Sequence, residues 1–439
     1  MAIFYSEKKA KKTAKPTACQ PFLIEGLDYQ GLGVAKHQGK TWFIENALPS
    51  EEVEIRILDE KRQYGRGQAV RFLKKSPLRQ TPSCELYGKC GGCQMQHIPL
   101  DLQRETKQQA LFQRLQKFQS KPIQFEPMIV GRDKGYRRRA RLSISVQNQQ
   151  VSLGFRQQNS QQIIPLAQCE VLADPLSALL PALQNLLSEW QQKKRLGHIE
   201  LVQADNTIVL LLRHLGAVNE ADQERLLTFA RHYHLSLFVM CEEDRIEHWS
   251  GELPYYHIHG LKLAFSVRDF IQINGELNHK MVDHALQWLD LQPQDRVLDL
   301  FCGMGNFTLP IAQRAGYVVG VEGVAEMVAQ AHQNAVTSGL KNVNFYQTNL
   351  DESFVDKEWA AESFNKILLD PARNGAYFAL DHLCELNPER IVYVSCNPAT
   401  LVRDAQKLVE KGYFLNKVAM IDMFPHTGHL ESILLFCKG

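Results

Sequence analysis

The chain has 439 residues, of which 44% are hydrophobic and 22% charged, and its formal net charge is +2. This composition excludes a disordered chain and predicts about two to four domains with hydrophobic cores. A net charge so close to zero excludes a protein that is basic throughout. Any polyanionic partner must therefore meet local clusters of lysine and arginine.

Two clusters of this kind stand out in the sequence. Residues 1–15 contain five lysines, and Arg137, Arg138, Arg139 and Arg141 lie close together further on. The tail is either a solvated end or an RNA contact. On a strand the arginines would alternate between faces, so they form either a phosphate-binding face or a plain solvated one.

The cellular compartment can be predicted from what the sequence lacks. No apolar run approaches the roughly 18 residues that a membrane-spanning helix needs, and the N-terminus lacks the apolar core of a signal peptide. We therefore expect a cytoplasmic protein without a membrane partner. Its ten cysteines are scattered, so reduced thiols, a metal site or catalysis are expected rather than a secreted disulfide framework.

Short alternating runs fill residues 16–74, after the basic tail. TWFIE and VEIRIL are examples, and turns containing Gly31, Gly33 and Gly39 interrupt the pattern. Such a pattern predicts a small closed β-barrel. The segment resembles the TRAM domain, an OB-like barrel attached to RNA-modifying enzymes, which implies a role in RNA binding.

A compact group of cysteines follows in SCELYGKCGGCQMQH. Cys84, Cys90 and Cys93 are separated by five and two residues, and thiols placed so closely risk oxidation unless something ligates them. A fourth ligand is needed, and Cys169 in PLAQCEVL is our choice among the other cysteines. Zinc usually takes cysteines in closely spaced pairs, so three clustered cysteines with one remote partner favour a [4Fe-4S] cluster over zinc.

Residues 75–262 predict an α+β domain that carries the cysteine group. Apolar residues recur at helical spacing from about residue 99 to 118. The runs YRRRARLSISV, VSLGFRQ, IELVQ and NTIVLLLRHL then read as strands, and LADPLSALLPALQNLLSEW reads as a helix between them.

Strands and helices alternate over residues 263–439, which predicts a Rossmann-like, doubly wound parallel sheet. In RVLDLFCGMGNFTLPIA, Gly303 and Gly305 let the backbone approach a ligand at the start of a helix. A dinucleotide fingerprint would need glycine or alanine at Thr308, so NAD is disfavoured. Glu322 follows Asp299 by 23 residues, the distance at which a carboxylate binds ribose hydroxyls. The sequence therefore predicts a multidomain α/β protein with an adenosine-containing ligand.

The run IVYVSCNP places Cys396 where a buried strand ends and Pro398 stops it. A lone cysteine in such a place is usually a small buried hydrophobe. Catalytic side chains in open α/β sheets also lie at such carboxyl ends. The neighbouring motifs DLFCGMGNFT, LLDPAR and FPHTGHLES favour the catalytic interpretation.

Five motifs in this order, DLFCGMGNF, VEGV, LLDPAR, VSCNP and FPHTGHLE, resemble those of S-adenosylmethionine-dependent RNA uracil-C5 methyltransferases. The barrel and the cysteine group make the chain similar to the branch acting on 23S ribosomal RNA at uridine 1939, without implying an obligate protein partner. The resemblance covers nearly the whole chain. It implies a nucleophile at Cys396, a base at Glu431 and cluster ligands at the four cysteines above. It further implies a methyl-donor site formed by Gln272, Phe301, Asn306, Glu322, Asn349 and Asp370.

The implied chemistry explains the need for a thiol and a base. A thiolate added at carbon 6 of uracil makes carbon 5 carbanion-like, and a base must then remove the carbon 5 proton before the thiolate can leave. The alternative role for Glu431 is a helix-cap or salt-bridge carboxylate, while Asp370 is better placed to orient the base or the donor. His426 and His429 are either polar core residues or phosphate contacts. An unstacked target base needs a stacking plane, for which the candidates are Phe270, Phe301 and Arg373.

Three other functions compete with this one. The target could be a different uridine in ribosomal or transfer RNA. An iron-sulfur RNA-binding or redox-sensing protein would not need Cys396, Asp370 and Glu431, yet all three are present. A DNA cytosine-C5 methyltransferase would carry a Pro-Cys nucleophile and a large target-recognition insert, and the sequence has neither.

Overall fold

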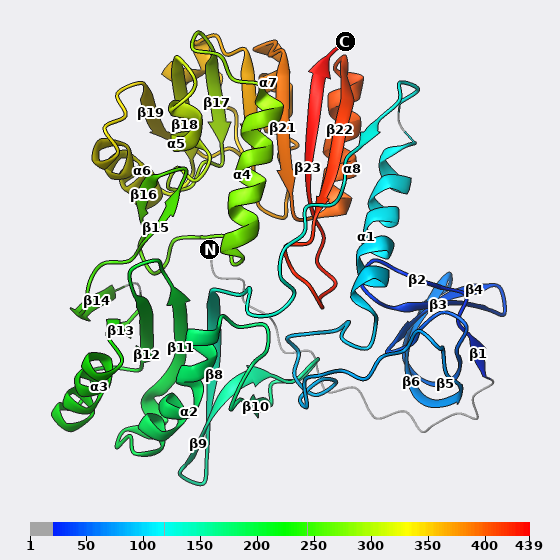
Figure 1. The fold of residues 1–439 in the computed structure, drawn as a ribbon, viewed down its shortest axis with the longest axis vertical. Coiled ribbons are helices and arrows are strands. Elements are labelled where there is room, and N and C mark those ends of the chain that lie inside the picture. The colour runs from blue at the N-terminus through cyan, green and yellow to red at the C-terminus, as the bar shows by residue number, and fades with distance from the viewer. Residues whose placement is uncertain (1–20, 118, 244) are drawn as a thin grey trace. The chain divides into compact units, whose positions relative to one another are not determined.

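The computed structural model describes residues 21–117, 119–243 and 245–439 (Figure 1). The basic tail predicted at residues 1–15 lies outside the described residues. The chain forms two compact units, Met1–Thr81 with His97–Pro99 and Pro82–Gln96 with Leu100–Gly439.

The first unit is one six-stranded sheet with the order β1-β5-β6-β4-β3-β2. β1 and β2 stand at opposite ends of this order but follow one another in the chain. Between them, the Ile24 N–H donates to Glu51 O and the Glu25 N–H donates to Val34 O, which joins the two edges. The strands are β1 (Phe22–Leu23), β2 (Gly26–Leu27), β3 (Gly33–His37), β4 (Lys40–Glu45), β5 (Glu52–Glu60) and β6 (Tyr64–Lys74).

Alternation along these strands builds the core of the unit. Trp42 and Ile44 of β4 point inward, as do Val53 and Ile55 of β5. A side chain at Gly65 would place its Cβ 2.4 Å from the Trp42 ring, so this position needs glycine. The β-rich domain predicted for this segment is confirmed.

In the second unit, a seven-stranded sheet has the order β10-β9-β8-β11-β12-β13-β14. Helices α2 and α3 pack on it, and a leucine-rich core forms between them and the sheet. The strands are β8 (Arg139–Gln147), β9 (Gln150–Arg156), β10 (Ile163–Pro165), β11 (Leu196–Gln203), β12 (Ile208–His214), β13 (Leu235–Glu242) and β14 (Arg245–Ser250). The helices are α1 (Leu100–Leu115), α2 (Asp174–Ser188) and α3 (Glu220–His232).

The predicted methyltransferase region, together with β7 from the preceding segment, forms an eight-stranded sheet with the order β19-β18-β17-β20-β21-β23-β22-β7. The first five strands are parallel, whereas β23 runs antiparallel to both of its neighbours. The strands are β7 (Gln124–Phe125), β17 (Arg296–Leu300), β18 (Tyr317–Glu322), β19 (Val343–Gln347), β20 (Lys366–Leu369), β21 (Arg390–Ser395), β22 (Tyr413–Ile421) and β23 (Glu431–Lys438). The helices are α4 (Gly275–Leu289), α5 (Thr308–Ala312), α6 (Ala325–Thr337), α7 (Ala379–Glu385) and α8 (Pro398–Glu410).

The two sheets of the second unit share a hydrophobic core. Val202 and Val209 of the seven-stranded sheet belong to the same buried cluster as Met281 of α4 and Val297 of β17. The hairpin of β15 (Tyr255–Ile258) and β16 (Leu261–Ala264) lies between the sheets in the chain. Residues 82–96 and 100–439, which span both predicted segments, therefore form a single compact unit.

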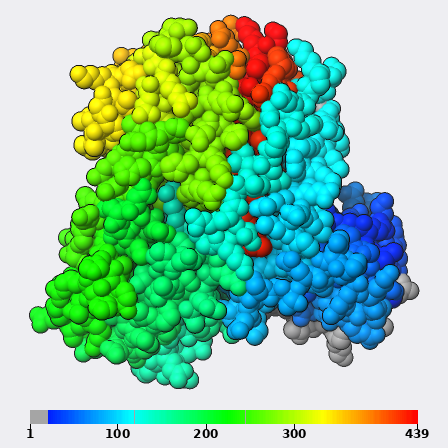
Figure 2. Space-filling model, in the orientation of Figure 1, coloured from blue at the N-terminus to red at the C-terminus, as the bar shows by residue number. Residues whose placement is uncertain are grey.

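The segment with α1 and β7 packs against the C-terminal elements. α1 contacts α8, and β7 extends the sheet beyond β22. Figure 2 shows this cyan segment covering the orange and red C-terminal residues on the face toward the viewer. Within the described ranges, no helix has the length and apolar character needed to cross a membrane.

Candidate active site

The site lies where the strand order of the eight-stranded sheet reverses direction. The chain reaches one edge at β19 and returns to the middle at β20, next to β17. Ligands bind outside the carboxyl ends of the strands at such a point. Phe301, Asp370 and Cys396 directly follow β17, β20 and β21, so the sheet brings these predicted residues to one edge.

Strand register places the predicted nucleophile beside the predicted base. The antiparallel pairing of β21 with β23 joins Ser395 to Ser432. One step further along, the same register sets Cys396 opposite Glu431. The two side chains come from segments that are 35 residues apart in the sequence, and they become neighbours because β23 inserts between β21 and β22.

The site is partly buried and rich in acidic groups. Burial is the largest cause that raises the pKa of the Cys396 thiol to about 11, and the carboxylates of Glu431 and Asp370 add to it. Burial also raises the pKa of Asp370 to about 7. For Glu431, burial and then Asp370 raise the pKa well above its ordinary value, while Arg373 opposes the shift. Cys396, Glu431, Asp370 and Arg373 therefore lie within electrostatic reach of one another.

This electrostatic coupling predicts how the thiol titrates. Glu431→Gln removes one carboxylate that disfavours the thiolate, so the pKa of Cys396 should fall. It should stay above the ordinary thiol value of 9.0, because burial is the larger cause and remains. The midpoint of Cys396 alkylation against pH, followed by peptide mass, measures this shift. Asp381→Asn, remote on α7, is the control, and an unchanged midpoint in Glu431→Gln would mean that its carboxylate does not face the thiol.

The loop after β17 has the conformation that its glycines predict. Phe301, Gly303 and Gly305 have φ angles of +64°, +57° and +98°. At Gly305 a Cβ would lie 2.9 Å from Leu309 on α5. Any other residue there would therefore clash with α5 and would also be strained by the positive φ. The loop thus turns its backbone toward the carboxyl edge of the sheet.

Glu322 fixes this loop from the end of β18. Its Oε2 accepts the Gly303 N–H at 3.2 Å, and its Oε1 accepts the N–H groups of Gly323 and Val324 at 2.8 and 3.1 Å. A carboxylate has about four acceptor positions. The three backbone bonds orient the group and leave capacity for one more donor, such as a ribose hydroxyl.

Asn306 is held by two residues that the motifs did not indicate. The side chains of Asn306 and Asn278 exchange hydrogen bonds of 2.9 Å in both directions, and the Tyr256 hydroxyl donates to Asn306 Oδ1 at 2.9 Å. The Arg138 guanidinium stacks 4.8 Å from the Tyr256 ring and donates to Gln272 O at 2.7 Å. Gln272 and Asn306 therefore belong to one connected network.

Asn349 is less closely connected to the other predicted residues. It follows β19 at the same edge of the sheet, but its side chain is exposed and donates to Glu352 at 2.7 Å. Of the stacking candidates, Phe270 is 65% exposed and free to meet a base. Arg373 lies 3.4 Å from His429 Nδ1, and its backbone carbonyl accepts the side-chain amide of Asn397.

The loop of residues 422–430, which leads into Glu431, is anchored at several points. Asp422 pairs with Arg104 at 2.8 Å and with the buried Lys107 at 3.6 Å, both on α1. The hydroxyl of Tyr136 donates to Pro425 O at 3.1 Å. These contacts join the position of Glu431 to helix α1 and to the segment that precedes β8.

His426 ties the same loop to the cysteine segment. Its carbonyl accepts the N–H groups of both Gln94 and Met95, at 2.9 and 3.0 Å. Its ring is buried and lies between Gln103 and Asp133, while its φ is +64°. Cys93 is the residue before Gln94. His426 is therefore a structural residue that links the cysteine segment to the loop bearing Glu431.

The fold gathers the four cysteines predicted as ligands. Cys90 forms an isolated antiparallel bridge with Gln157, and the Cys169 N–H donates to Ser177. Burial and then the nearby thiolates of Cys169, Cys90 and Cys84 raise the pKa of Cys93 to about 12. Among residues 21–117, 119–243 and 245–439, no group of three or more His, Cys, Asp or Glu side chains is arranged to hold a metal ion.

The arginine cluster at 137–141 is largely structural. Arg139 donates to the carbonyls of Asp269 and Val267 at 2.6 and 2.8 Å, and Arg138 donates to that of Gln272. These two residues hold the segment that carries Phe270 and Gln272 instead of forming an open phosphate-binding face. No local pattern indicates this role, because the partners lie about 130 residues away in the chain.

The doubly wound sheet, with its glycine loop and a carboxylate at the switch point, defines a protein that binds an adenosine-containing ligand. The sequence profile of the tRNA (uracil-5-)-methyltransferase family matches residues 100–439, and that of the TRAM domain matches residues 18–70. The chain belongs to the tRNA (uracil-5-)-methyltransferase family. It is an S-adenosylmethionine-dependent RNA uracil-C5 methyltransferase.

Two relatives resemble the chain over its entire length. A Haemophilus ducreyi protein named 23S rRNA (uracil(1939)-C(5))-methyltransferase RlmD is 63% identical, covering 100% of both chains. A Histophilus somni protein of the same name is 56% identical, covering 99% of both. The Pyrococcus abyssi tRNA (uracil-54, C5)-methyltransferase, solved with S-adenosyl-L-homocysteine, matches with a TM-score of 0.74 at 22% identity. That match covers 95% of this chain and 99% of that one, and it shows a shared fold.

Proposed function

We propose that the protein methylates carbon 5 of uridine 1939 in 23S ribosomal RNA through a covalent adduct on Cys396. The observation that carries the chemistry is the register that sets Cys396 opposite Glu431 at the carboxyl edge of the sheet. The full-length similarity to relatives named for this reaction supports the choice of substrate. An enzyme that modifies ribosomal RNA works where ribosomes are assembled, so we also propose a cytoplasmic location.

In the first step, the Cys396 thiolate bonds to carbon 6 of the target uracil. The electron pair of the ring double bond moves toward the oxygen on carbon 4, and carbon 5 becomes nucleophilic. The carboxylates of Glu431 and Asp370 disfavour the thiolate. A cationic sulfonium bound nearby would offset this repulsion, which ties activation of Cys396 to occupancy of the donor site. When bound, S-adenosylmethionine supplies the methyl group that carbon 5 accepts.

In the second step, Glu431 takes the proton from carbon 5. The electrons of that bond restore the ring double bond, and the bond between carbon 6 and the Cys396 sulfur breaks. Burial raises the pKa of Glu431, which makes its ionised form a stronger base than an exposed glutamate. Since both Cys396 and Glu431 act in their ionised forms, the reaction rate should rise with pH.

We further propose that Cys84, Cys90, Cys93 and Cys169 hold a [4Fe-4S] cluster. Support comes from their sequence spacing and from the mutual effect of their thiolates on the pKa of Cys93. In a four-iron cluster each thiolate binds a different iron, so the ligands stand further apart than four thiolates around one zinc ion. Such a centre would bind all four thiols as deprotonated ligands, which would remove this mutual repulsion between thiolates.

Mapping 5-methyluridine in ribosomal and transfer RNA tests the proposed substrate. Cells that lack the protein should lose the modification at position 1939 of 23S RNA, and the wild-type gene should restore it. A Cys396→Ala gene should not, because carbon 5 is then never activated. If 23S RNA stays fully modified while a transfer RNA loses its 5-methyluridine, the chain acts on a different uridine. Unchanged RNA of both kinds would favour a protein without this activity.

A further inference from the structure

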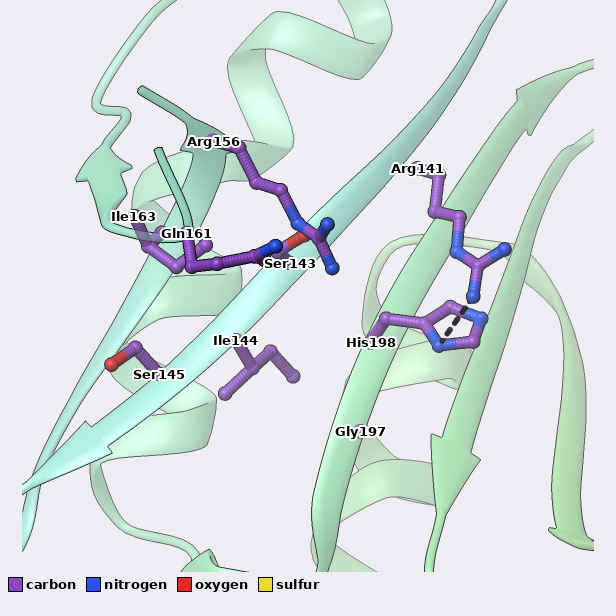
Figure 3. Close-up of a pocket in the computed structure, with 9 residues that line it drawn as sticks. All are labelled: Arg141, Ser143, Ile144, Ser145, Arg156, Gln161, Ile163, Gly197 and His198. Atoms are coloured by element: carbon purple, nitrogen blue, oxygen red, sulfur yellow. Dashed lines mark hydrogen bonds between the residues drawn. The ribbon is translucent and has the colours of Figure 1, made fainter. Parts of the chain in front are cut away.

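A polar groove of about 640 Å³ opens on the seven-stranded sheet, away from the residues of the active site. Figure 3 shows Arg156 and Gln161 on one side of it and Arg141 and His198 on the other, with Ser143 beside the Arg156 side chain. Its lining is dominated by side chains that donate hydrogen bonds. These are Arg141, Ser143, Ser145, Arg156, Gln161 and His198.

Strand geometry creates the groove. Arg141, Ser143 and Ser145 alternate along β8, so they share one face, while Leu142 is buried in the core on the other. The pairing of β8 with β9 ends at Ser143 and Gly154. Extending this register by two residues sets Arg141 against Arg156, where the two strands diverge.

Arg141 and Arg156 therefore place two positive charges on opposite sides of the groove. Glu200 lies opposite Arg141 in the pairing of β8 with β11 and compensates part of this charge. It pairs with Arg139 at 3.1 Å and reaches Arg141 only at 3.9 Å. For Arg156, no ion pair is found in the described part of the chain. Arg139 and Arg141 share this carboxylate, and the described residues that line the groove include two arginines but no Asp or Glu, so the groove keeps an excess of positive charge.

The start of β8 connects the groove to the segment that carries the exposed Phe270. Arg139, at the start of β8, holds the carbonyls of Val267 and Asp269, next to the exposed Phe270. From there β8 runs through the groove to Ser145 at ~3.3 Å per residue, a path of roughly 20 Å. This length matches about six stacked nucleotides at ~3.4 Å each.

We propose that this groove binds the phosphate backbone of the RNA strand that flanks the target uridine. Arg141 and Arg156 each contact a phosphate, and the hydroxyls of Ser143 and Ser145 donate to the same strand. The inference rests on the proposed function, because the RNA must enter the active site for its flank to follow β8. It adds a second RNA-binding surface, which fixes the register of the substrate without reading its bases.

The test compares Arg141→Gln/Arg156→Gln with Arg314→Gln, which removes an exposed charge after α5. Binding to an RNA fragment that contains the target and its flanks is measured at several salt concentrations. Each lost phosphate contact lowers the salt slope by ~0.7 for a single strand. The slope of the double variant should therefore be smaller by about 1.4. If both proteins bind equally at 1 M salt, the variant should bind about 25-fold more weakly than wild type at 0.1 M salt. The control should match wild type.

A second readout separates the groove from the active site. On a short RNA that has the target loop but no flanks, the double variant should methylate as fast as wild type. Equal losses on short and long RNA, or an unchanged salt slope, would overturn the inference. Binding of a polyglutamate peptide to wild type but not to the double variant would also overturn it, because the groove would then be a site for an acidic protein. If wild type itself neither binds nor methylates the RNA, it is the proposed function that fails.

Discussion

Glu431→Gln is expected to arrest the enzyme on its RNA as a covalent complex. Glutamine has nearly the same shape as glutamate but cannot accept the carbon 5 proton, so Cys396 still adds and the methyl group still transfers. The bond between sulfur and carbon 6 then cannot break. Denaturing electrophoresis with labelled RNA should show a band that contains protein and RNA, and turnover should fall by roughly 10²-fold to 10⁴-fold.

Cys396→Ala provides the matched control. Without the thiol no bond to carbon 6 forms, so this variant should give neither turnover nor a covalent band. A double variant with both substitutions should behave like Cys396→Ala alone. A band that persists without Cys396 would show that another residue is the nucleophile.

The second large effect concerns the cysteine group. Anaerobically purified protein should be brown and contain about four irons per chain. Cys93→Ser should remove the cluster and loosen the adjacent Gln94 and Met95, whose N–H groups bind His426. Because His426 lies in the loop that leads to Glu431, the base should move. A displacement of about 1 Å can cost roughly 10²-fold in rate.

Hydrogen exchange of residues 422–431 measures this displacement independently of activity. Exchange there should increase in Cys93→Ser, while binding of the methyl donor changes little. Cys241→Ser on β13, outside the cysteine group, should leave both iron content and exchange unchanged. Colourless wild-type protein with one zinc ion would rule out the cluster. If residues 422–431 exchange as slowly in Cys93→Ser as in wild type, the link through His426 is ruled out.

Features that depend on local sequence could be predicted. The strand before Cys396, the glycine loop and the apolar run after Glu431 each occupy one continuous segment, and the structure contains each of them. β21 ends at Ser395, and α8 begins at Pro398. The Asn397 side chain caps this helix by accepting the Ala399 N–H, and proline is favoured at the first helical position.

Features that depend on partners distant in the chain could not be predicted. Sequence does not reveal that β23 inserts between β21 and β22, and only that order sets Glu431 beside Cys396. The same holds for Arg139, whose spacing suggests a phosphate-binding face but whose partners are carbonyls of a distant segment. Tyr256 and Asn278 carry no motif, since they act through Asn306.

The mass of the complex trapped by Glu431→Gln most directly tests the assignment of Cys396 as the nucleophile and Glu431 as the base. The account predicts the mass of protein plus RNA fragment plus one methyl group, with the link mapped to the peptide that contains Cys396. A complex without the methyl group, or normal turnover by Glu431→Gln, would contradict it, because the proton would then be removed by another residue.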